Sequence, residues 1–128
     1  MKFYIQKRVY YHDTDCGGVV YYASYLKHLE EARSEYCVHK GIDLKQLSEK
    51  GIYFVVARIE VDYKSAANYW DILKITAEVK EVRRSSLIFE QQIYKEDKLL
   101  VSAKTYWVCV NKKFKPVSIP QEIRKKLQ

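Results

Sequence analysis

The sequence predicts an α+β fold in which one long helix packs against a mostly antiparallel five-stranded sheet. Between Tyr22 and Cys37 the apolar residues recur every three or four positions, which is typical of one face of a helix. From Val55 onward apolar and polar residues alternate, which is typical of strands with one face on a core. The connections between these strands are short enough for hairpins. A helix and a sheet that each have one apolar face bury those faces against each other in two layers.

The expected elements follow in the order strand, long helix, short helix and four strands. Residues 2–11 are rich in aromatic and β-branched side chains, which favours a first strand. The long helix is expected to end at Gly41, because glycine is the usual residue just past a helix C-terminus. Asp43 and Gln46 have the spacing of a capping box, which predicts a short second helix through Glu49.

Four further strands are predicted after Gly51, where the period of the apolar residues changes to two. They are expected at residues 55–64, 73–80, 87–94 and 101–109. The segments "RRSS" (83–86) and "KEDK" (95–98) are typical of hairpin connections. The segment "QEIRKKL" after Pro120 predicts a terminal helical turn.

Length and composition indicate a single globular domain that spans residues 1–128. No apolar stretch has the length of a secretory h-region or of a membrane span, so we expect neither. The three cysteines, Cys16, Cys37 and Cys109, are odd in number and widely spaced, which favours a reducing compartment, the cytoplasm. Cys37 and Cys109 fall in apolar patterns typical of a core, whereas the role of Cys16 stays open.

The net charge of +7 favours an anionic partner, which could be nucleic acid, an acidic membrane face or a phosphorylated small molecule. The twelve tyrosines fall mostly on strand and helix faces, which favours core and interface packing over stacking on nucleic-acid bases. On the helix, Glu30 and Arg33 are three residues apart and are expected to pair on its surface.

The segment "YHDTDCGG" (11–18) places two aspartates, Asp13 and Asp15, just before the long helix. The spacing of Asp13, Asp15 and Gly18 starts like a calcium-binding EF-hand loop, but Ser24 stands where that loop needs a bidentate Glu. A transition-metal site would need further ligands elsewhere in the chain. Neither a glycine-rich nucleotide loop nor a G-x-S-x-G nucleophile motif is present.

Two interpretations of the aspartates stay open on these residues alone. In one, they are acidic residues near a helix N-terminus, where the helix dipole favours negative charge. In the other, Gly17 and Gly18 remove side-chain bulk, so that a ligand can approach the unpaired N–H groups of the helix start. A carboxylate beside such a donor can attack a carbonyl carbon or activate water, which suits acyl transfer.

The segment "VYYHDTDCGGVVYYASYLKHLEEARSEY" resembles the signature of hotdog-fold acyl-CoA thioesterases. It is most similar to the 4-hydroxybenzoyl-CoA thioesterase group and to the Tol–Pal-associated thioesterases. The resemblance implies a hotdog fold, in which the sheet wraps around the central helix. The number and order of the expected strands fit the family along nearly the whole chain.

The resemblance also implies roles for individual residues. Asp15 would be the catalytic carboxylate, either as nucleophile or as general base, and the backbone N–H of Tyr22 would polarise the thioester carbonyl. Gly17 and Gly18 would lie against the substrate, and Asp13 would be structural. The tyrosine side chain at position 22 is a departure, because many Tol–Pal-associated members have histidine there.

A second resemblance concerns Arg83 and Arg84, which are similar to the basic segment that meets the nucleotide phosphates of coenzyme A in the 4-hydroxybenzoyl-CoA group. The planar guanidinium group suits phosphate because it can donate two parallel hydrogen bonds. A solvated hairpin tip is the alternative for these two arginines. Lys112, Lys113 and Lys115 are further candidates, for which a solvated charge run is the simpler interpretation.

The function implied by the resemblance is hydrolysis of a small acyl-CoA thioester to a free acid and coenzyme A, with no cofactor. Alternatives are a hydroxyacyl dehydratase, a non-catalytic binder of acyl-CoA or acyl carrier protein, and a nucleic-acid-binding protein. The acidic loop would have no role in nucleic-acid binding, so we expect no such partner. A lone hotdog sheet leaves strand edges exposed, and the resemblance implies a homodimer that pairs again into a homotetramer, with the site at the dimer interface.

Overall fold

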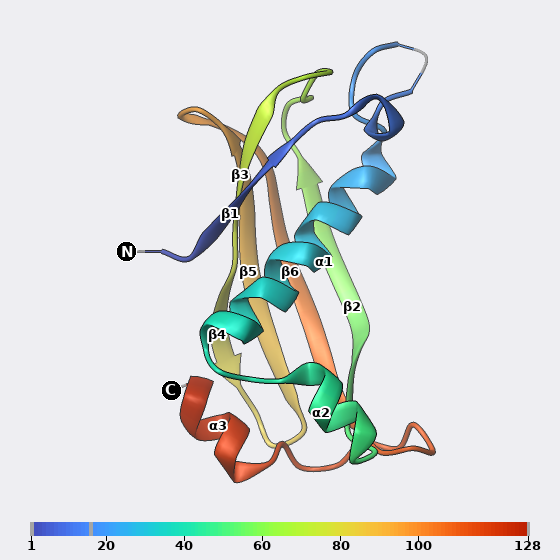
Figure 1. Cartoon of the computed structure of the whole chain (residues 1–128), viewed down its shortest axis with the longest axis vertical. Coiled ribbons are helices and arrows are strands. Elements are labelled where there is room, and N and C mark those ends of the chain that lie inside the picture. Colours follow the sequence, from blue (N-terminus) through green and yellow to red (C-terminus); the bar gives the residue numbers. More distant parts are fainter. Residues whose placement is uncertain (1, 16, 128) are drawn as a thin grey trace.

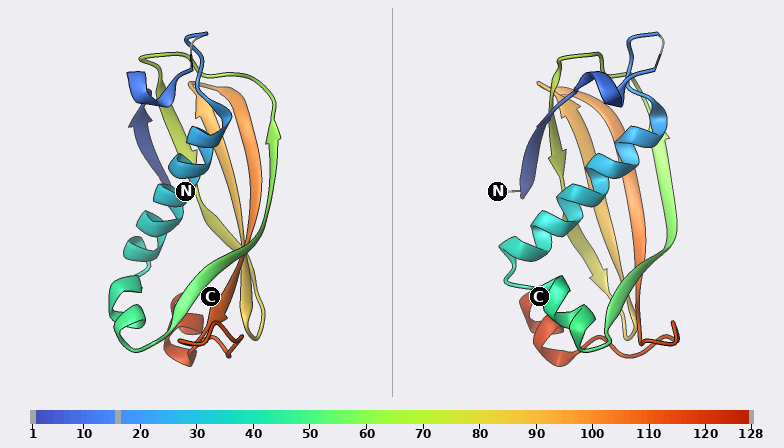
Figure 2. Two further views of the ribbon diagram at one scale, coloured as in Figure 1. Left: turned by 90° about the vertical axis from the view of Figure 1, so that its right-hand side faces the viewer. Right: turned by 45° about the vertical axis from the view of Figure 1, so that its right-hand side comes forward.

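One long helix lies across one face of a curved antiparallel sheet in the computed structural model, which describes residues 2–15 and 17–127 (Figures 1 and 2). The helix is α1 (Tyr22–His39), and the sheet bends around it from both sides. The other helices are η1 (Tyr11–Asp13), α2 (Leu44–Glu49) and α3 (Gln121–Leu127). The strands are β1 (Tyr4–Arg8), β2 (Tyr53–Tyr63), β3 (Ile72–Thr76), β4 (Glu78–Val82), β5 (Ser86–Lys95) and β6 (Lys98–Val110). The predicted α+β class is confirmed.

The strands follow the order β1-β3-β5-β6-β2, and β4 also pairs with β5. The sheet has six strands where five were expected, because the strand that the sequence predicts at 73–80 is divided at Ala77. The Ala77 N–H donates to the Phe3 carbonyl (3.2 Å) in the segment before β1. Toward β5, the Gln92 N–H donates to Thr76 Oγ1 (2.9 Å) and Gln91 Nε2 donates to the Thr76 carbonyl (3.2 Å). Side-chain hydrogen bonds therefore interrupt the backbone pairing with β5 here, and the strand continues as β4 along the same edge of β5.

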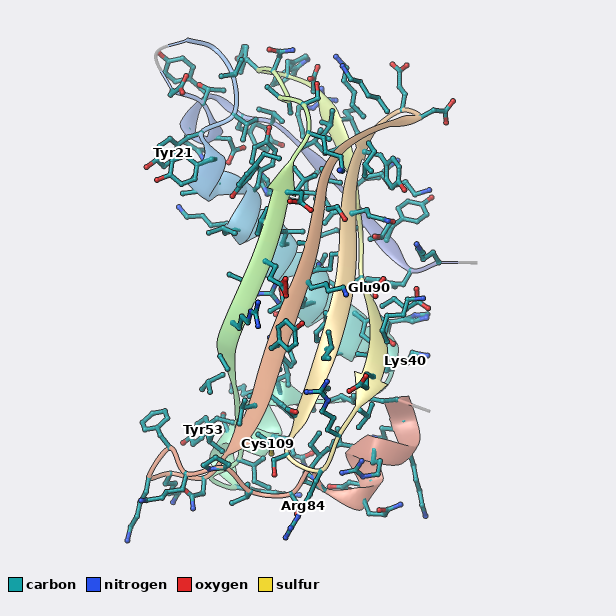
Figure 3. All side chains as sticks on the ribbon, turned by 180° about the vertical axis from the view of Figure 1, so that it is seen from behind. Tyr21, Lys40, Tyr53, Arg84, Glu90 and Cys109 are labelled. Atoms are coloured by element: carbon teal, nitrogen blue, oxygen red, sulfur yellow. The ribbon has the colours of Figure 1, made fainter. Side chains whose placement is uncertain are left out.

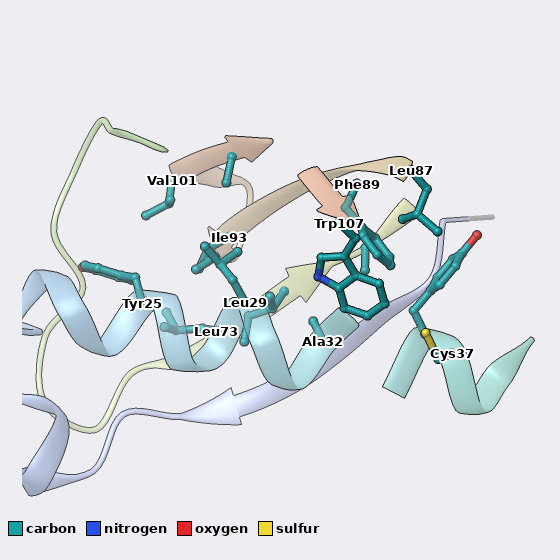
Figure 4. Close-up of a cluster of buried hydrophobic side chains, with 14 of the residues drawn as sticks. Tyr25, Leu29, Ala32, Cys37, Leu73, Leu87, Phe89, Ile93, Val101 and Trp107 are labelled. Atoms are coloured by element: carbon teal, nitrogen blue, oxygen red, sulfur yellow. The ribbon is translucent and has the colours of Figure 1, made fainter. Parts of the chain in front are cut away.

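The core lies between the inner face of the sheet and the buried face of α1 (Figure 4). Leu29 and Ala32 of α1 are fully buried against it, as is Phe89 of β5. The rings of Phe89 and Trp107 meet edge to face with their centroids 4.8 Å apart. Alternating side chains of β5 and β6 supply this face, as the period of two predicts.

A buried polar cluster interrupts the apolar core beneath α1. Arg33 Nη1 donates to Gln91 Oε1 (3.0 Å) and to Thr105 Oγ1 (3.3 Å). Gln91 Nε2 donates in turn to the Leu29 carbonyl (2.9 Å), which ties the helix to the sheet. Burial lowers the pKa of the Arg33 guanidinium. The expected surface pairing of Arg33 with Glu30 is therefore wrong, because the guanidinium turns inward.

The predicted helix ends are confirmed in the structure. Gly41 follows α1 with a φ of +76°, a backbone conformation that glycine adopts without a steric cost. Asp43 Oδ1 accepts a hydrogen bond from the Gln46 N–H (3.0 Å), which caps α2. Lys126 of α3 donates to the Gly41 carbonyl (2.7 Å), so the terminal helix packs beside the C-terminal end of α1.

The fold places the two candidate sites at opposite ends of the molecule. Figure 3, which views the sheet from behind, shows Tyr21 at the N-terminal end of α1 and Arg84 at the other end. The aspartate loop lies beside Tyr21, and the arginines lie in the β4–β5 connection. Of the helices in the described residues, none combines the length and the hydropathy that a bilayer crossing requires.

Candidate active site

Asp15 lies at the base of a closed loop that leads into α1. Thr14 and Val20 form an isolated antiparallel bridge across the loop. Inside this bridge the Asp15 N–H donates to the Val19 carbonyl (3.0 Å), and the Asp15 carbonyl accepts from the Gly18 N–H (3.1 Å). The backbone of Asp15 is therefore fixed, although its side chain is exposed.

The Asp15 carboxylate is held by Gly17, the first glycine of the pair that the sequence singled out. Asp15 Oδ1 accepts a hydrogen bond from the Gly17 N–H (2.8 Å). A β-carbon at residue 17 would come within 3.3 Å of this oxygen, so a larger residue would crowd the carboxylate. Gly18 has a φ of +80°, which favours glycine. Cys16, whose role the sequence left open, lies outside the described residues.

The first turn of α1 has backbone donors that the helix itself does not use. Tyr21 precedes the helix in an extended conformation, and no side chain in the described part of the chain caps this end. The Tyr21 N–H donates to the Asp13 carbonyl and the Ser24 N–H to the Tyr21 carbonyl, both at 2.8 Å. The N–H of Tyr22 belongs to the first turn, where N–H groups have no intrahelical acceptor. It is thus available to a ligand.

Asp13 differs from Asp15 in almost every respect. It is 3% exposed, and its Oδ2 accepts a hydrogen bond from the Tyr10 N–H (2.9 Å). Its Oδ1 lies 3.5 Å from His28 Nε2 and 3.5 Å from His12 Nδ1. The carboxylate of Asp13 is therefore occupied within the protein, whereas the Asp15 carboxylate faces solvent.

Exposed aromatic rings surround this end of the molecule. The Tyr22 and Tyr63 rings lie 6.3 Å apart, and the Tyr63 hydroxyl donates to the Tyr22 carbonyl (3.3 Å). On the other side of the loop, the Arg8 guanidinium lies 4.3 Å from the centre of the Trp70 ring. The exposed aromatic residues at this end are Tyr10, Tyr11, Tyr21, Tyr22, Tyr63, Tyr69 and Trp70. The sequence interpretation of the tyrosines as core and interface residues did not single out this cluster.

Tyr25, one turn further along α1, is buried and holds the β2–β3 connection. Its hydroxyl accepts a hydrogen bond from the Ala67 N–H (2.8 Å), and burial raises the pKa of this hydroxyl. The neighbouring Asn68 forms an isolated bridge with Val19 of the aspartate loop. The β2–β3 connection therefore packs against both the loop and the helix start.

Arg83 and Arg84 are exposed at the opposite end of the fold. Arg83 forms an ion pair with Glu81. Arg84 Nε donates to Ser118 Oγ (3.0 Å), and its carbonyl accepts from Arg124 Nη2 (3.1 Å). The structure therefore does not bring these arginines to Asp15 within one chain.

No metal centre is found among residues 2–15 and 17–127, where no three His, Cys, Asp or Glu side chains form a possible ligand group. Cys37 and Cys109 are buried free thiols. Burial raises the pKa of Cys37 to about 12, so this thiol is a poor nucleophile near neutral pH. The described groups at the start of α1 include the exposed Asp15 carboxylate and the N–H groups of the first helical turn.

Comparisons with known proteins give consistent matches over most of the chain. The family model of the thioesterase-like superfamily matches residues 9–127. The acyl-CoA thioesterase YbgC of Haemophilus influenzae is 40% identical over 121 residues, which are 91% of this chain and 88% of that protein.

Solved structures match as well. A probable thioesterase from Bartonella henselae has a TM-score of 0.89 at 31% identity, covering 94% of this chain and 100% of that one. A 4-hydroxybenzoyl-CoA thioesterase in complex with 4-hydroxybenzoyl-CoA has a TM-score of 0.90 and covers 99% of both chains. Its sequence identity of 20% makes this last match a likeness of fold alone.

Proposed function

The chain belongs to the thioesterase-like superfamily and has its hotdog fold, and from this premise we propose that it is an acyl-CoA thioesterase. The reaction would hydrolyse a small acyl-CoA thioester to a free acid and coenzyme A. One observation carries the proposal for the site. The exposed carboxylate of Asp15 lies in a loop that leads directly into the N-terminus of α1, which none of the described side chains caps.

In this proposal the Tyr22 N–H binds the carbonyl oxygen of the thioester. The hydrogen bond strengthens as negative charge develops on that oxygen, so it stabilises the transition state more than the substrate. The helix dipole adds a partial positive charge at the same place. A backbone donor does not depend on the side chain, so the tyrosine at position 22 preserves it.

Asp15 would take part in the reaction by one of two routes. As a nucleophile, its carboxylate forms a bond to the carbonyl carbon, the C–S bond breaks, and water later hydrolyses the resulting anhydride. As a general base, it takes a proton from a water molecule that attacks the same carbon. Both routes consume one water and release the acid and the thiol of coenzyme A. Neither needs a cofactor, since coenzyme A enters as part of the substrate.

Coenzyme A recognition would require a second copy of the chain. If Arg83 and Arg84 bind the nucleotide phosphates, they must come from another subunit than Asp15, because the two sites lie at opposite ends of one chain. The strand order ends at β2, which pairs only with β6 among the described residues. Val56 and Tyr63 on this edge strand are 50% and 46% exposed.

We therefore propose a homodimer in which the β2 edges of two chains meet, because such edges are usually covered. Pairing of two such dimers into a homotetramer is proposed as well. The cytoplasm is proposed as the compartment, since the buried cysteines Cys37 and Cys109 are free thiols.

The proposed activity is tested with a panel of short, long and aromatic acyl-CoA thioesters and a thiol-detecting reagent. We expect turnover of at least one substrate class, and loss of that turnover in Asp15→Asn. Binding of acyl-CoA without turnover by the parent protein would contradict the enzyme and favour the alternative, a non-catalytic binder of acyl-CoA or acyl carrier protein. If the Asp15→Asn variant stays active, the thioesterase function stands and the catalytic role of Asp15 is rejected.

A further inference from the structure

His28 is a buried histidine that the proposed reaction does not use. It lies on α1, and its side chain is 6% exposed. Its Nε2 is 3.5 Å from Asp13 Oδ1, and its Nδ1 is 3.4 Å from Glu31 Oε1. One imidazole ring thus lies between two carboxylates, one on the aspartate loop side and one on its own helix.

The groups around His28 form a continuous row in which basic side chains alternate with carboxylates. Glu31 Oε1 lies 3.3 Å from Lys7 Nζ on β1, and Asp13 Oδ1 lies 3.5 Å from His12 Nδ1 on η1. A neutral imidazole has one N–H and can donate to one of its two carboxylates, whereas an imidazolium ion can donate to both. Within the described residues Nε2 makes no hydrogen bond, and Asp13 Oδ1 at 3.5 Å is the acceptor that it faces.

Asp13 transmits this contact to the active-site loop. Its carboxylate accepts from the Tyr10 N–H (2.9 Å) before the loop, and its carbonyl accepts from the Tyr21 N–H (2.8 Å) after the loop. Asp13 therefore joins both ends of the segment that contains Asp15 and leads into the first turn of α1. His28 is the side chain of α1 that faces the Asp13 carboxylate at this junction.

We propose that His28 is a positioning residue, which docks the Asp13 junction onto α1 and thereby holds Asp15 against the Tyr22 N–H. The inference rests on the proposed function, because it assigns these two groups to the reaction. Catalysis requires both groups to meet one carbonyl, and a displacement of about 1 Å can cost roughly 10²-fold in rate. Burial keeps the His28 ring from the substrate, so it acts through Asp13 and not on the reacting atoms.

Three substitutions of His28 separate this role from mere filling of space. His28→Phe keeps the bulk and removes both polar contacts. His28→Gln places an amide nitrogen near the position of Nε2, which faces Asp13, whereas His28→Asn reaches only the position of Nδ1, which faces Glu31. Thr105→Val is the matched control, since it removes a buried polar contact to Arg33 from the same helix–sheet interface without touching the loop.

Steady-state kinetics on a substrate of the parent protein gives the first test. We expect His28→Phe and His28→Asn to lower kcat about tenfold or more with KM within about threefold, as expected when alignment is lost but uniform binding is kept. His28→Gln should recover most of kcat, and Thr105→Val should leave it unchanged. Equal kcat in all four variants, or no difference between Gln and Asn, would overturn the proposal.

Amide hydrogen exchange gives a second test that does not depend on activity. In His28→Phe the hydrogen-bonded amides of Asp13, Asp15, Gly18 and Tyr21 should exchange about tenfold faster, while the amides of β5 keep their protection, because only the junction opens. His28→Gln and Thr105→Val should leave these four amides protected. Unchanged exchange of these amides in His28→Phe would overturn the proposal even if the parent turned over no thioester. A parent without activity but with the expected exchange would reject the proposed function alone.

Discussion

The two ends of the molecule use their charged side chains in opposite ways. At the N-terminal end of α1, the exposed Asp15 carboxylate accepts a hydrogen bond from Gly17. It precedes a helix start that no side chain caps within residues 2–15 and 17–127. At the other end of the molecule, Arg83 pairs with Glu81 and Arg84 donates to Ser118, so both guanidinium groups already have local partners. The end with the exposed carboxylate and the N–H groups of the helix start is suited to a reaction. The basic end is suited to binding, because its arginines can exchange their present partners for the phosphates of a ligand.

The largest expected effect is the fall in kcat when Asp15, at the N-terminal end of α1, is replaced. Asp15→Asn keeps the size of the side chain but removes its basicity and nucleophilicity, so we expect kcat to fall by about 10²–10⁴. The melting temperature should stay the same or rise, because an exposed catalytic carboxylate does not stabilise the fold. The measurement is turnover and thermal unfolding of both proteins. Residual turnover within about tenfold of the parent, below the usual range for such a group, would remove Asp15 from the catalytic role.

Asp13→Asn is the matched control two residues away. Its buried carboxylate serves the Tyr10 N–H and faces two histidines, so the change should lower stability by about 1–3 kcal/mol. The loss in kcat should be smaller than that of Asp15→Asn. A larger loss of kcat at Asp13 would exchange the roles of the two aspartates.

A smaller effect is expected at the basic end. Arg83→Ala with Arg84→Ala should raise KM for acyl-CoA about tenfold, since a charge-assisted hydrogen bond contributes about 1.5–3 kcal/mol and solvent exposure reduces it. The value of kcat should change less, because phosphate contacts far from the thioester bind substrate and transition state alike. The defect should vanish with a pantetheine thioester that lacks the nucleotide. Equal defects with both substrates would exclude the phosphate role.

Mixing two impaired variants tests whether Asp15 and the arginines of one site come from different subunits. Subunits with Asp15→Asn are combined with subunits that carry the double arginine change, and light scattering follows the assembly. If the two ends act across subunits, each mixed pair holds one site with an intact aspartate and intact arginines, so sites with the KM of the parent reappear. If they act within one subunit, only sites with the raised KM remain. A monomer in light scattering would contradict the shared site altogether.

The smallest expected effect concerns the local partner of Arg84. Ser118→Ala removes the acceptor of the Arg84 Nε hydrogen bond and frees the guanidinium for phosphate. We expect KM to fall by roughly twofold, the equivalent of a net hydrogen bond of about 0.5 kcal/mol. This change is opposite in sign to that of the arginine substitutions. A rise in KM would mean that Ser118 orients Arg84 for the ligand instead of competing with it.

The sequence alone predicts much of the fold, because local signals mark it. The period of the apolar residues predicts α1 and the strands, and Gly41 and Asp43 mark two helix ends through their own backbone and capping chemistry. The division of one strand at Ala77 depends on the contact between Thr76 and Gln92, sixteen positions apart in the chain. No local pattern contains that contact.

The candidate site is only partly predictable for a similar reason. Asp15, Gly17 and Gly18 stand together in one motif, but His28 and Arg33 resemble ordinary polar residues of a helix surface. Their signal lies in the helical period, since His28 is four residues before the buried Ala32 and Arg33 four after the buried Leu29. The distance between Asp15 and the two arginines follows from the length of α1. It could be predicted only once the site was known to lie at the start of this helix.

The position of β2 at the edge of the sheet has a consequence for the order of folding. Strands β5 and β6 form a hairpin in which Lys95 pairs with Lys98, so little chain entropy is lost when they meet. Strand β2 pairs with the last strand, with Tyr63 against Val101 and Tyr53 against Val110, and must close a loop that includes three intervening strands. Such distant contacts form slowly. Strand β2, the edge that we propose to join two chains, is thus in place only after this long loop closes. Association of two chains therefore follows the slowest step of folding.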